Sequence, residues 1–182
     1  MNNTKNIMIV GVGGQGTLLA SRILGNAVIR MGYDVKVSEV HGMSQRGGSV
    51  VTYVKYGEKV YSPVIDNGEA DIVLAFELLE AYRALPALKV GGQLIVNDQR
   101  INPMPVITGA AQYPENILEK LSSKVNTTAV DALALATEAG SIKAVNVVLI
   151  GVMAKNTNIP YEVWIETIRT TVPPKFLDIN LK

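Results

Sequence analysis

Two glycine-rich segments contain the residue types that could bind a charged ligand. The first, Gly11-Val12-Gly13-Gly14-Gln15-Gly16, follows an apolar run and precedes a segment with helical periodicity. Glycine has no Cβ, so such a turn lets the backbone come close to an anion, and the N–H groups and dipole of the following helix favour a phosphate. The G-x-G-x-x-G spacing is that of dinucleotide-binding folds. A turn that only allows tight strand–helix packing is the alternative, and the flanking strand and helix favour the anion site.

The second segment is His41-Gly42-Met43-Ser44-Gln45-Arg46-Gly47-Gly48, after a second expected strand. Loops at the carboxyl ends of neighbouring parallel strands meet at the ligand crevice of such sheets. We therefore expect this loop to face the glycine turn. Arg46 is the expected partner of a phosphate or carboxylate, because its planar fork matches such groups, although a surface arginine is the alternative. His41 has no evident acid partner and is expected to be structural.

The predicted cofactor-binding residues come from these two segments and the start of the following helix: Gly11, Gly13, Gly14, Gln15, Gly16, Thr17, Ser44, Gln45, Arg46 and Gly47. No residue is predicted to be catalytic or to bind a metal. Asn97-Asp98-Gln99-Arg100 ends another expected strand at the same edge and is a weaker candidate to line the crevice. Glu39 lies near the end of the second strand, where dinucleotide-binding folds place the acid that bonds the ribose hydroxyls. A solvated acid at a strand end is the alternative for Glu39.

The composition excludes several kinds of site. The chain of 182 residues has no cysteine, so disulfides, thiolate metal sites and cysteine-held iron–sulfur clusters are ruled out. Its one histidine rules out a multi-histidine metal site within one chain. A net charge of +1 gives no electrostatic reason to bind nucleic acid or a membrane. The N-terminus is polar, and the longest apolar stretch, Val145–Ala154, is about half the ~20 residues that span a bilayer, so we expect a cytoplasmic protein.

The hydrophobic pattern predicts one α/β domain over residues 1–182, with a Rossmann-like, mostly parallel sheet flanked by helices, an inserted β-hairpin and a C-terminal helical portion. Strands are expected at 7–10, 33–40, 49–56, 70–76, 93–97 and 125–130, and helices at 17–31, 77–88, 115–123, 132–139, 142–155 and 161–171. The first two strands are expected to pair in parallel through a right-handed crossover. The hairpin is expected from 49–56 and a return strand over 59–65. Asp131 is the expected N-cap of helix 132–139.

Together, the glycine turn and the loop at 41–48 resemble a known family. It is the γ-type domain of the 2-oxoacid:ferredoxin oxidoreductases, and the likeness is closest to the β subunit of the indolepyruvate-type enzymes. The likeness covers nearly the whole chain, including the strand at 70–76 and the C-terminal Pro173-Pro174-Lys175. It implies oxidative decarboxylation of a 2-oxoacid to an acyl-CoA, with electrons passed to ferredoxin.

The resemblance also implies how the work is divided between chains. Thiamine diphosphate and iron–sulfur clusters would reside on a larger catalytic partner subunit, and ferredoxin would be met through the complex. Gly11, Gly13, Gly14 and Gly16 would meet an anionic part of coenzyme A, and Gln45 and Arg46 would shape the same crevice. The chain alone would then be inactive.

Two other hypotheses stay open. An NAD-binding enzyme or regulator is favoured by the glycine turn and Glu39. The hairpin in place of a second crossover opposes it, as does a chain that leaves little room for a substrate domain. The other hypothesis is a scaffold module with a vestigial glycine turn.

Overall fold

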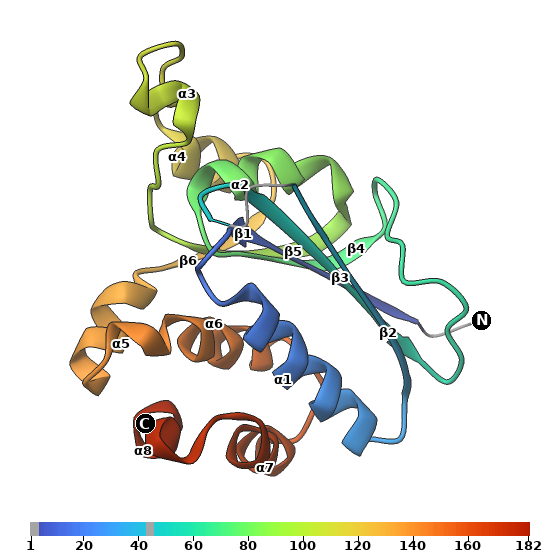
Figure 1. The fold of residues 1–182 in the computed structure, drawn as a ribbon. Helices are drawn as coiled ribbons and strands as arrows, with labels where there is room; N and C mark the ends of the chain where they lie inside the picture. The colour runs from blue at the N-terminus through green and yellow to red at the C-terminus, as the bar shows by residue number, and fades with distance from the viewer. Residues whose placement is uncertain (1–3, 43–45) are drawn as a thin grey trace.

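In the computed structural model, which describes residues 4–42 and 46–182, six strands form one sheet in the order β2-β3-β1-β4-β5-β6 (Figure 1). The strands are β1 (Lys5–Val12), β2 (Asp34–His41), β3 (Ser49–Gly57), β4 (Ala70–Ala75), β5 (Leu88–Asn97) and β6 (Asn126–Val130). The helices are α1 (Thr17–Arg30), α2 (Leu78–Ala84), α3 (Met104–Ile107), α4 (Ile117–Ser122), α5 (Ala132–Ala139), α6 (Val145–Ala154), α7 (Tyr161–Thr171) and α8 (Leu177–Leu181). Short 3₁₀ turns cover Leu85–Ala87, Ile142–Ala144 and Pro174–Phe176.

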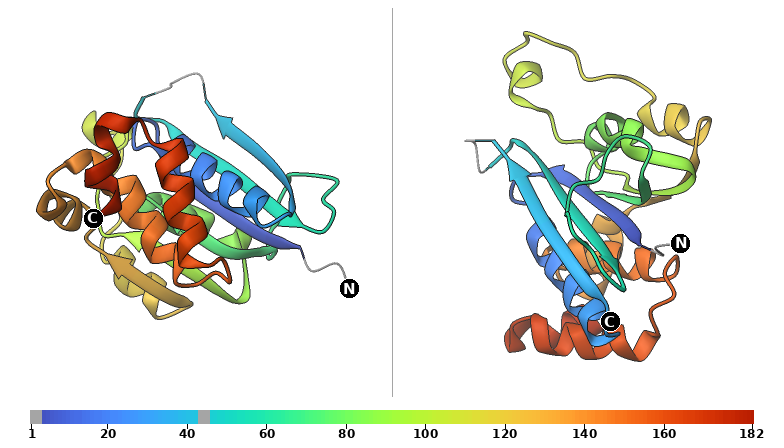
Figure 2. Two further views of the ribbon diagram at one scale, coloured as in Figure 1. Left: turned by 90° about the horizontal axis from the view of Figure 1, so that it is seen from below. Right: turned by 90° about the vertical axis from the view of Figure 1, so that its right-hand side faces the viewer.

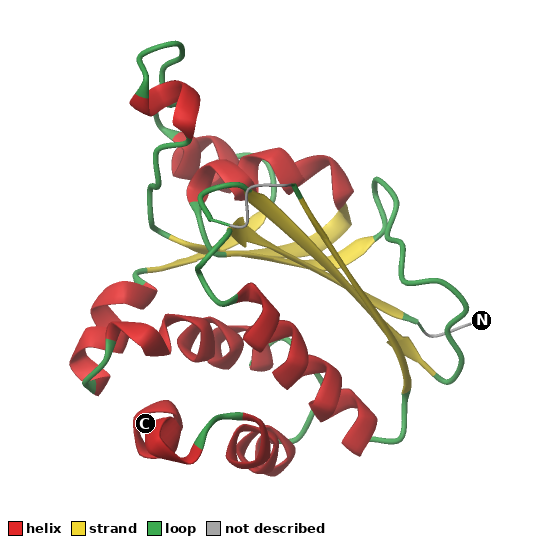
Figure 3. Ribbon diagram, viewed as in Figure 1, coloured by secondary structure: helices red, strands yellow, loops and turns green. Residues whose placement is uncertain are grey.

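The parallel half of the sheet consists of β1, β4, β5 and β6. β1 and β4 are apolar and buried over most of their length, as is typical of parallel strands covered on both faces. Figure 3 shows helices on both sides of this sheet. The predicted α/β fold with a mostly parallel sheet is therefore confirmed, and the predicted helices and strands are found near their expected positions, apart from the return strand.

The antiparallel half of the sheet corrects one prediction. β1 and β2 do not pair, because β3 lies between them and is antiparallel to both. Val54 of β3 is opposite Ile7 of β1 on one side and Val37 of β2 on the other. The connection through α1 thus places β2 two positions away from β1, and β3 then fills the position between them. The alternation of β3 buries Val54, which is 0% exposed, together with every second neighbour from 50 to 56.

The expected return strand at 59–65 does not form. This segment is irregular, and its polar backbone groups bond side chains instead of a strand. The N–H of Val60 donates to Oδ2 of Asp34 (2.9 Å), and Nζ of Lys55 donates to the carbonyl of Val64 (2.7 Å). Pro63 in addition has no N–H for a ladder. The strand that forms an antiparallel pair with β3 and is connected to it directly is instead the preceding strand, β2, which is joined to it through residues 42–48.

Two helical layers cover the sheet. α1, α5, α6, α7 and α8 pack on one face, and α2 and α4 pack on the other (Figures 1 and 2). The helix after β1 and the helix after β4 therefore lie on opposite faces. This makes the boundary between β1 and β4 a topological switch point, where open α/β sheets bind ligands beyond the carboxyl ends of their strands.

The apolar stretch Val145–Ala154 forms α6, which is packed between the sheet and the outer helices. Within the part of the chain that the structure describes, no helix combines the length and the apolar character needed to cross a membrane. The hydrophobicity of α6 is explained by its place in the core.

Alkaline pH should weaken the fold through Tyr56, which is 8% exposed and packs 5.6 Å, centroid to centroid, from the ring of Tyr33. Burial is the main cause that raises the pKa of Tyr56 to about 12, with smaller effects of Tyr33 and Asp71. An unfolded tyrosine titrates near pH 10, so above that pH the unfolded chain releases a proton that the native state keeps. The free energy of unfolding should therefore fall as pH rises from 10 to 12, by at most about 1.4 kcal/mol per pH unit from this group.

Urea unfolding between about pH 8 and about pH 11 measures this slope. We expect Tyr56→Phe to reduce it, whereas Tyr61→Phe, at an 84% exposed position, should not. An unchanged slope in Tyr56→Phe would contradict the assignment.

Candidate functional site

The glycine turn between β1 and α1 uses its glycines in different ways. Gly14 (φ 105°) and Gly16 (φ 85°) are in the left-handed region that glycine favours. A Cβ on Gly11 would lie 3.0 Å from Cβ of Phe76, so this glycine lets the end of β1 approach the segment after β4. A Cβ on Gly16 would lie 2.7 Å from Nδ2 of Asn146, whereas a Cβ on Gly14 would have no atom of the described residues beyond its chain neighbours within 4 Å. Of these three glycines, it is Gly14 that faces open space.

α1 begins at the same place. The helix has 14 residues, its N-cap Gly16 makes no side-chain cap bond, and no acidic residue lies in its first turn. The N–H groups of Leu19 and Ala20 bond the carbonyl of Gly16, so helix geometry leaves the amides nearer the turn for a ligand. Thr17 is only 5% exposed, so its side chain is largely inaccessible, and the predicted contact with a ligand would have to come from its backbone N–H. Such a helix start favours an anion.

Gln15 shapes the turn from within. Its Oε1 accepts from the N–H of Val12 (2.7 Å), and its Nε2 donates to the carbonyl of Phe76 (2.9 Å) and to Oε1 of Gln99 (3.2 Å). One side chain therefore joins the ends of β1 and β4 and the segment after β5. The prediction that Gln15 contacts a ligand remains a prediction, and the contacts of its amide within the protein are structural.

Asn97 extends this network and is 0% exposed. Its Nδ2 donates to the carbonyl of Phe76 (3.2 Å) and to Oε1 of Gln99 (3.0 Å), and its Oδ1 accepts from the N–H of Ala132 (3.0 Å) at the start of α5. Asp131 caps the same helix by accepting from the N–H of Ala134 (2.8 Å), as predicted. The expected crevice residues after β5 thus lie at the edge that holds the glycine turn.

The loop between β2 and β3 faces the glycine turn, as predicted. The N–H of Gly13 donates to the carbonyl of Gly48 (2.8 Å), and the N–H of Gly47 donates to the carbonyl of Gly13 (3.2 Å). Gly47 has φ 77°, and Arg46 beside it is exposed. The other predicted loop contacts, Ser44 and Gln45, lie outside the described residues. The backbone of Gly47 and Gly48 is therefore paired with that of Gly13.

Glu39 does not lie where a dinucleotide site would need it, and His41 makes only a local contact. Oε2 of Glu39 accepts from Oγ1 of Thr52 (3.3 Å), and β3 separates its strand from β1. In dinucleotide-binding folds the ribose-binding acid ends the strand next to the first one. Nδ1 of His41 lies 3.0 Å from the carbonyl of Gly42, and the residue is exposed. The geometry therefore speaks against the NAD hypothesis.

Sequence reasoning missed a buried acid, Glu77, which directly follows Phe76 after β4 and is 1% exposed. Its Oε2 accepts from the N–H of Glu80 (2.9 Å) and caps α2. Its Oε1 accepts from the hydroxyl of Tyr113 (2.5 Å) and from the N–H of Ile101 (3.0 Å). The sequence offered one signal for this role, an acid placed immediately after a buried parallel strand. Because glutamate is not a preferred N-cap residue, that signal did not single out Glu77.

Tyr113 and Glu80 complete this group. Burial is the first cause, and the hydrogen bond to Glu77 the second, that raises the pKa of the Tyr113 hydroxyl well above its ordinary value. Glu80, 5% exposed, accepts from Oγ of Ser49 (2.5 Å) and from Nη1 of Arg83 (2.6 Å). Because Ser49 begins β3, this contact ties α2 to the strand that follows the glycine-rich loop.

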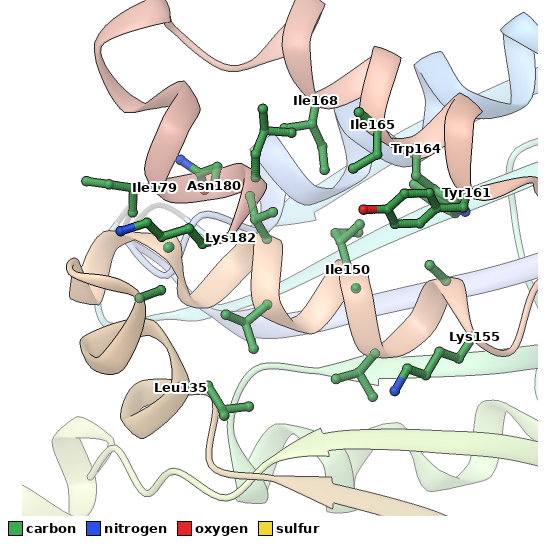
Figure 4. Close-up of a pocket in the computed structure, with 18 of the residues that line it drawn as sticks. Leu135, Ile150, Lys155, Tyr161, Trp164, Ile165, Ile168, Ile179, Asn180 and Lys182 are labelled. Atoms are coloured by element: carbon green, nitrogen blue, oxygen red, sulfur yellow. The ribbon is translucent and has the colours of Figure 1, made fainter.

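A separate cleft of about 800 Å³ opens among helices α5, α6, α7 and α8. Figure 4 shows Ile150 of α6 facing Trp164 and Ile168 of α7, with Leu135 of α5 on the far side. The lining is mainly apolar, and none of the predicted cofactor-binding residues belongs to it. This cleft is therefore not part of the crevice beside the glycine turn.

The sequence profile of the family described as pyruvate ferredoxin/flavodoxin oxidoreductase matches residues 6–182. The chain belongs to this family. The resemblance inferred from the two glycine-rich segments is therefore confirmed. The match spans every strand and helix of the fold except the first residue of β1.

Members of the family and solved structures agree with this assignment. The chain is 46% identical to indolepyruvate oxidoreductase subunit IorB of Thermococcus kodakarensis, over 97% of this chain and 91% of that one. The γ subunit of a keto/oxoacid ferredoxin oxidoreductase from Geobacter sulfurreducens superposes with a TM-score of 0.69 and 26% identity, over 97% and 91% of the two chains. The fold also recurs in 2-oxoglutarate:ferredoxin oxidoreductase from Magnetococcus marinus (TM-score 0.73, 19% identity), where it covers 100% of this chain and 30% of that longer chain.

The role of Gln15 predicts that Gln15→Glu destabilises the protein. The remaining oxygen could still accept from Val12, but the second oxygen would face the carbonyl of Phe76 and Oε1 of Gln99 without a proton to share. Losing these bonds in a partly buried place should lower the free energy of unfolding by about 1–3 kcal/mol. Chemical denaturation at neutral pH measures the change. Gln112→Glu, in an exposed loop, is the matched control, and equal stability of the two variants would contradict the network.

Proposed function

We propose that this chain is the non-cofactor subunit of a 2-oxoacid:ferredoxin oxidoreductase that oxidatively decarboxylates indolepyruvate or another arylpyruvate to an acyl-CoA. The observation that carries the proposal is the pairing of the two glycine-rich segments through Gly13, Gly47 and Gly48. It occurs in a chain that is 46% identical to a subunit of an indolepyruvate oxidoreductase. The pairing brings the segment that holds Arg46 to the turn before α1, and the amides at that helix start together with the guanidinium would form the anion site that this chain contributes to the enzyme.

In this proposal the crevice beside Gly14 binds an anionic phosphate group of coenzyme A. Among residues 4–42 and 46–182, only the chain neighbours of Gly14 lie within 4 Å of where its Cβ would point. The start of α1 directs backbone N–H groups and the positive end of its dipole to such an anion. Arg46 follows in the opposing loop and has the geometry to bind phosphate. These residues bind and orient coenzyme A, and none is assigned a chemical step.

The groups that perform the redox chemistry belong to a larger partner subunit. This chain has no cysteine to ligate an iron–sulfur cluster. Across 4–42 and 46–182, no three His, Asp or Glu side chains converge as a metal ion would require. When bound on the partner, thiamine diphosphate supplies the decarboxylation chemistry and the clusters carry electrons to ferredoxin. The chain alone is expected to be inactive.

Purification tests this division of work directly. We expect the chain, tagged and isolated under anaerobic conditions from its native host, to bring with it a larger subunit that contains iron, acid-labile sulfide and thiamine diphosphate. The complex should reduce ferredoxin with indolepyruvate and coenzyme A faster than with pyruvate. A chain that purifies alone and carries a nucleotide would instead support the NAD hypothesis.

The anion site predicts a specific defect in Gly14→Val. A branched side chain would fill the open space and would resist a φ of 105°. In the assembled enzyme, the KM for coenzyme A should rise by at least about tenfold, the loss of one charge-assisted bond, with a smaller change in the KM for the 2-oxoacid. Gly140→Val is the matched control, because Gly140 has φ 111° and equally open surroundings at the end of α5.

Arg46→Ala gives a second variant for the same prediction. It removes a cation without straining the backbone and should also raise the KM for coenzyme A more than the KM for the 2-oxoacid. Arg169→Ala, an exposed arginine on α7, serves as its control. If Gly14→Val and Arg46→Ala both left the KM for coenzyme A unchanged, the crevice would not be its binding site.

A further inference from the structure

Residues 100–112, between β5 and α4, form an arm that projects beyond the two helical layers (Figures 1 and 2). None of these residues is buried. Its short helix α3 presents Met104 and Ile107, which are 68% and 66% exposed. Arg100 is the only charged residue of the arm. A protruding segment that is apolar and uncharged along most of its length is unusual for a surface loop.

The arm has a defined conformation of its own. The N–H of Thr108 donates to the carbonyl of Met104 (2.9 Å), and the N–H of Ala111 donates to the carbonyl of Pro105 (3.0 Å). Pro103 and Pro105 restrict the backbone on either side of Met104. An arm that is already ordered loses less conformational entropy when it binds. Its exposed side chains are therefore already held in a fixed arrangement before a partner binds.

One buried carboxylate anchors both ends of the arm. Oε1 of Glu77 accepts from the N–H of Ile101 at one end and from the hydroxyl of Tyr113 just after the other. The guanidinium of Arg100 lies 4.3 Å from the centre of the Tyr113 ring and closes the base. Glu77 directly follows Phe76, whose carbonyl accepts from Gln15 of the glycine turn. The arm is thus attached to the same edge of the sheet as the crevice.

We propose that the arm inserts Met104 and Ile107 into an apolar groove of the larger, cofactor-bearing subunit and aligns the crevice with it. This inference rests on the proposed function. Coenzyme A held beside Gly14 must reach chemistry located on the other chain, so that chain has to adjoin this edge of the sheet. The arm projects from that edge and carries two exposed apolar side chains near its tip. Methionine suits such a contact because its flexible side chain adapts to a groove.

The test is the double variant Met104→Asp/Ile107→Asp, co-expressed with the larger subunit that purifies with the wild-type chain. Placing two carboxylates in an apolar groove should reduce the recovered complex at least about tenfold, because anchors of this kind dominate binding energy. Val90→Asp is the matched control, since Val90 is fully exposed at the opposite end of β5. Thermal unfolding of the full-length variants should match that of wild type, because the substituted side chains are exposed.

The outcomes separate this inference from the proposed function. Loss of the complex in the double variant, with the control intact, supports the arm as the docking element. A complex that both variants form as wild type does overturns the docking role and leaves the proposed function standing. If both variants lose the complex, the arm has no special role and the inference fails. If wild type brings down no larger subunit but self-associates through Met104 and Ile107, both proposals fail.

Discussion

The need to satisfy backbone groups where β1, β4 and β5 end determines the shape of the candidate site. Gln15 meets this need by accepting from Val12 and donating to Phe76, and Asn97 adds a second amide to the same carbonyl. Gln15 lies inside the glycine turn, so the same bonds that close the sheet also fix the turn. The turn is thereby held with Gly14 away from the other described residues, and the proposed anion site depends on how the strands end.

The position of β3 then decides what kind of ligand this edge can take. In a dinucleotide-binding sheet, the strand beside the first one ends in an acid that binds ribose hydroxyls. Here that place is taken by the antiparallel strand β3, which begins at the crevice, and Glu39 on β2 accepts a hydrogen bond from Thr52 of β3. The wall opposite Gly13 is therefore the backbone of Gly47 and Gly48. The amides at the start of α1 and the guanidinium of Arg46 would suit the phosphate groups of the proposed ligand.

The sequence predicted these features unevenly, and the reason is the range of the contacts involved. Glycine spacing and apolar periodicity are local, so β1, α1 and the turn between them were predictable, as was the Asp131 cap. That the loop at 41–48 meets the turn was predicted from a rule for neighbouring parallel strands. The contact instead arises because β3 pairs with β1 and its first residue, Ser49, lies opposite Val12. The insertion of β3 depends on pairing across the sheet, which alternation alone does not specify. The roles of Gln15 and Glu77 depend on partners 61 and 36 residues away, Phe76 and Tyr113, and no local pattern marks them.

Two consecutive residues after β4, Phe76 and Glu77, connect the glycine turn to the arm. The carbonyl of Phe76 holds the glycine turn through Gln15, and the carboxylate of Glu77 holds the arm through Ile101 and Tyr113. Glu77 is only 1% exposed, which leaves it little freedom to move independently of β4. A partner that grips the arm would therefore also fix the position of the strand end on which the anion site is built. Such a connection would let the proposed assembly and the proposed coenzyme binding depend on one rigid element.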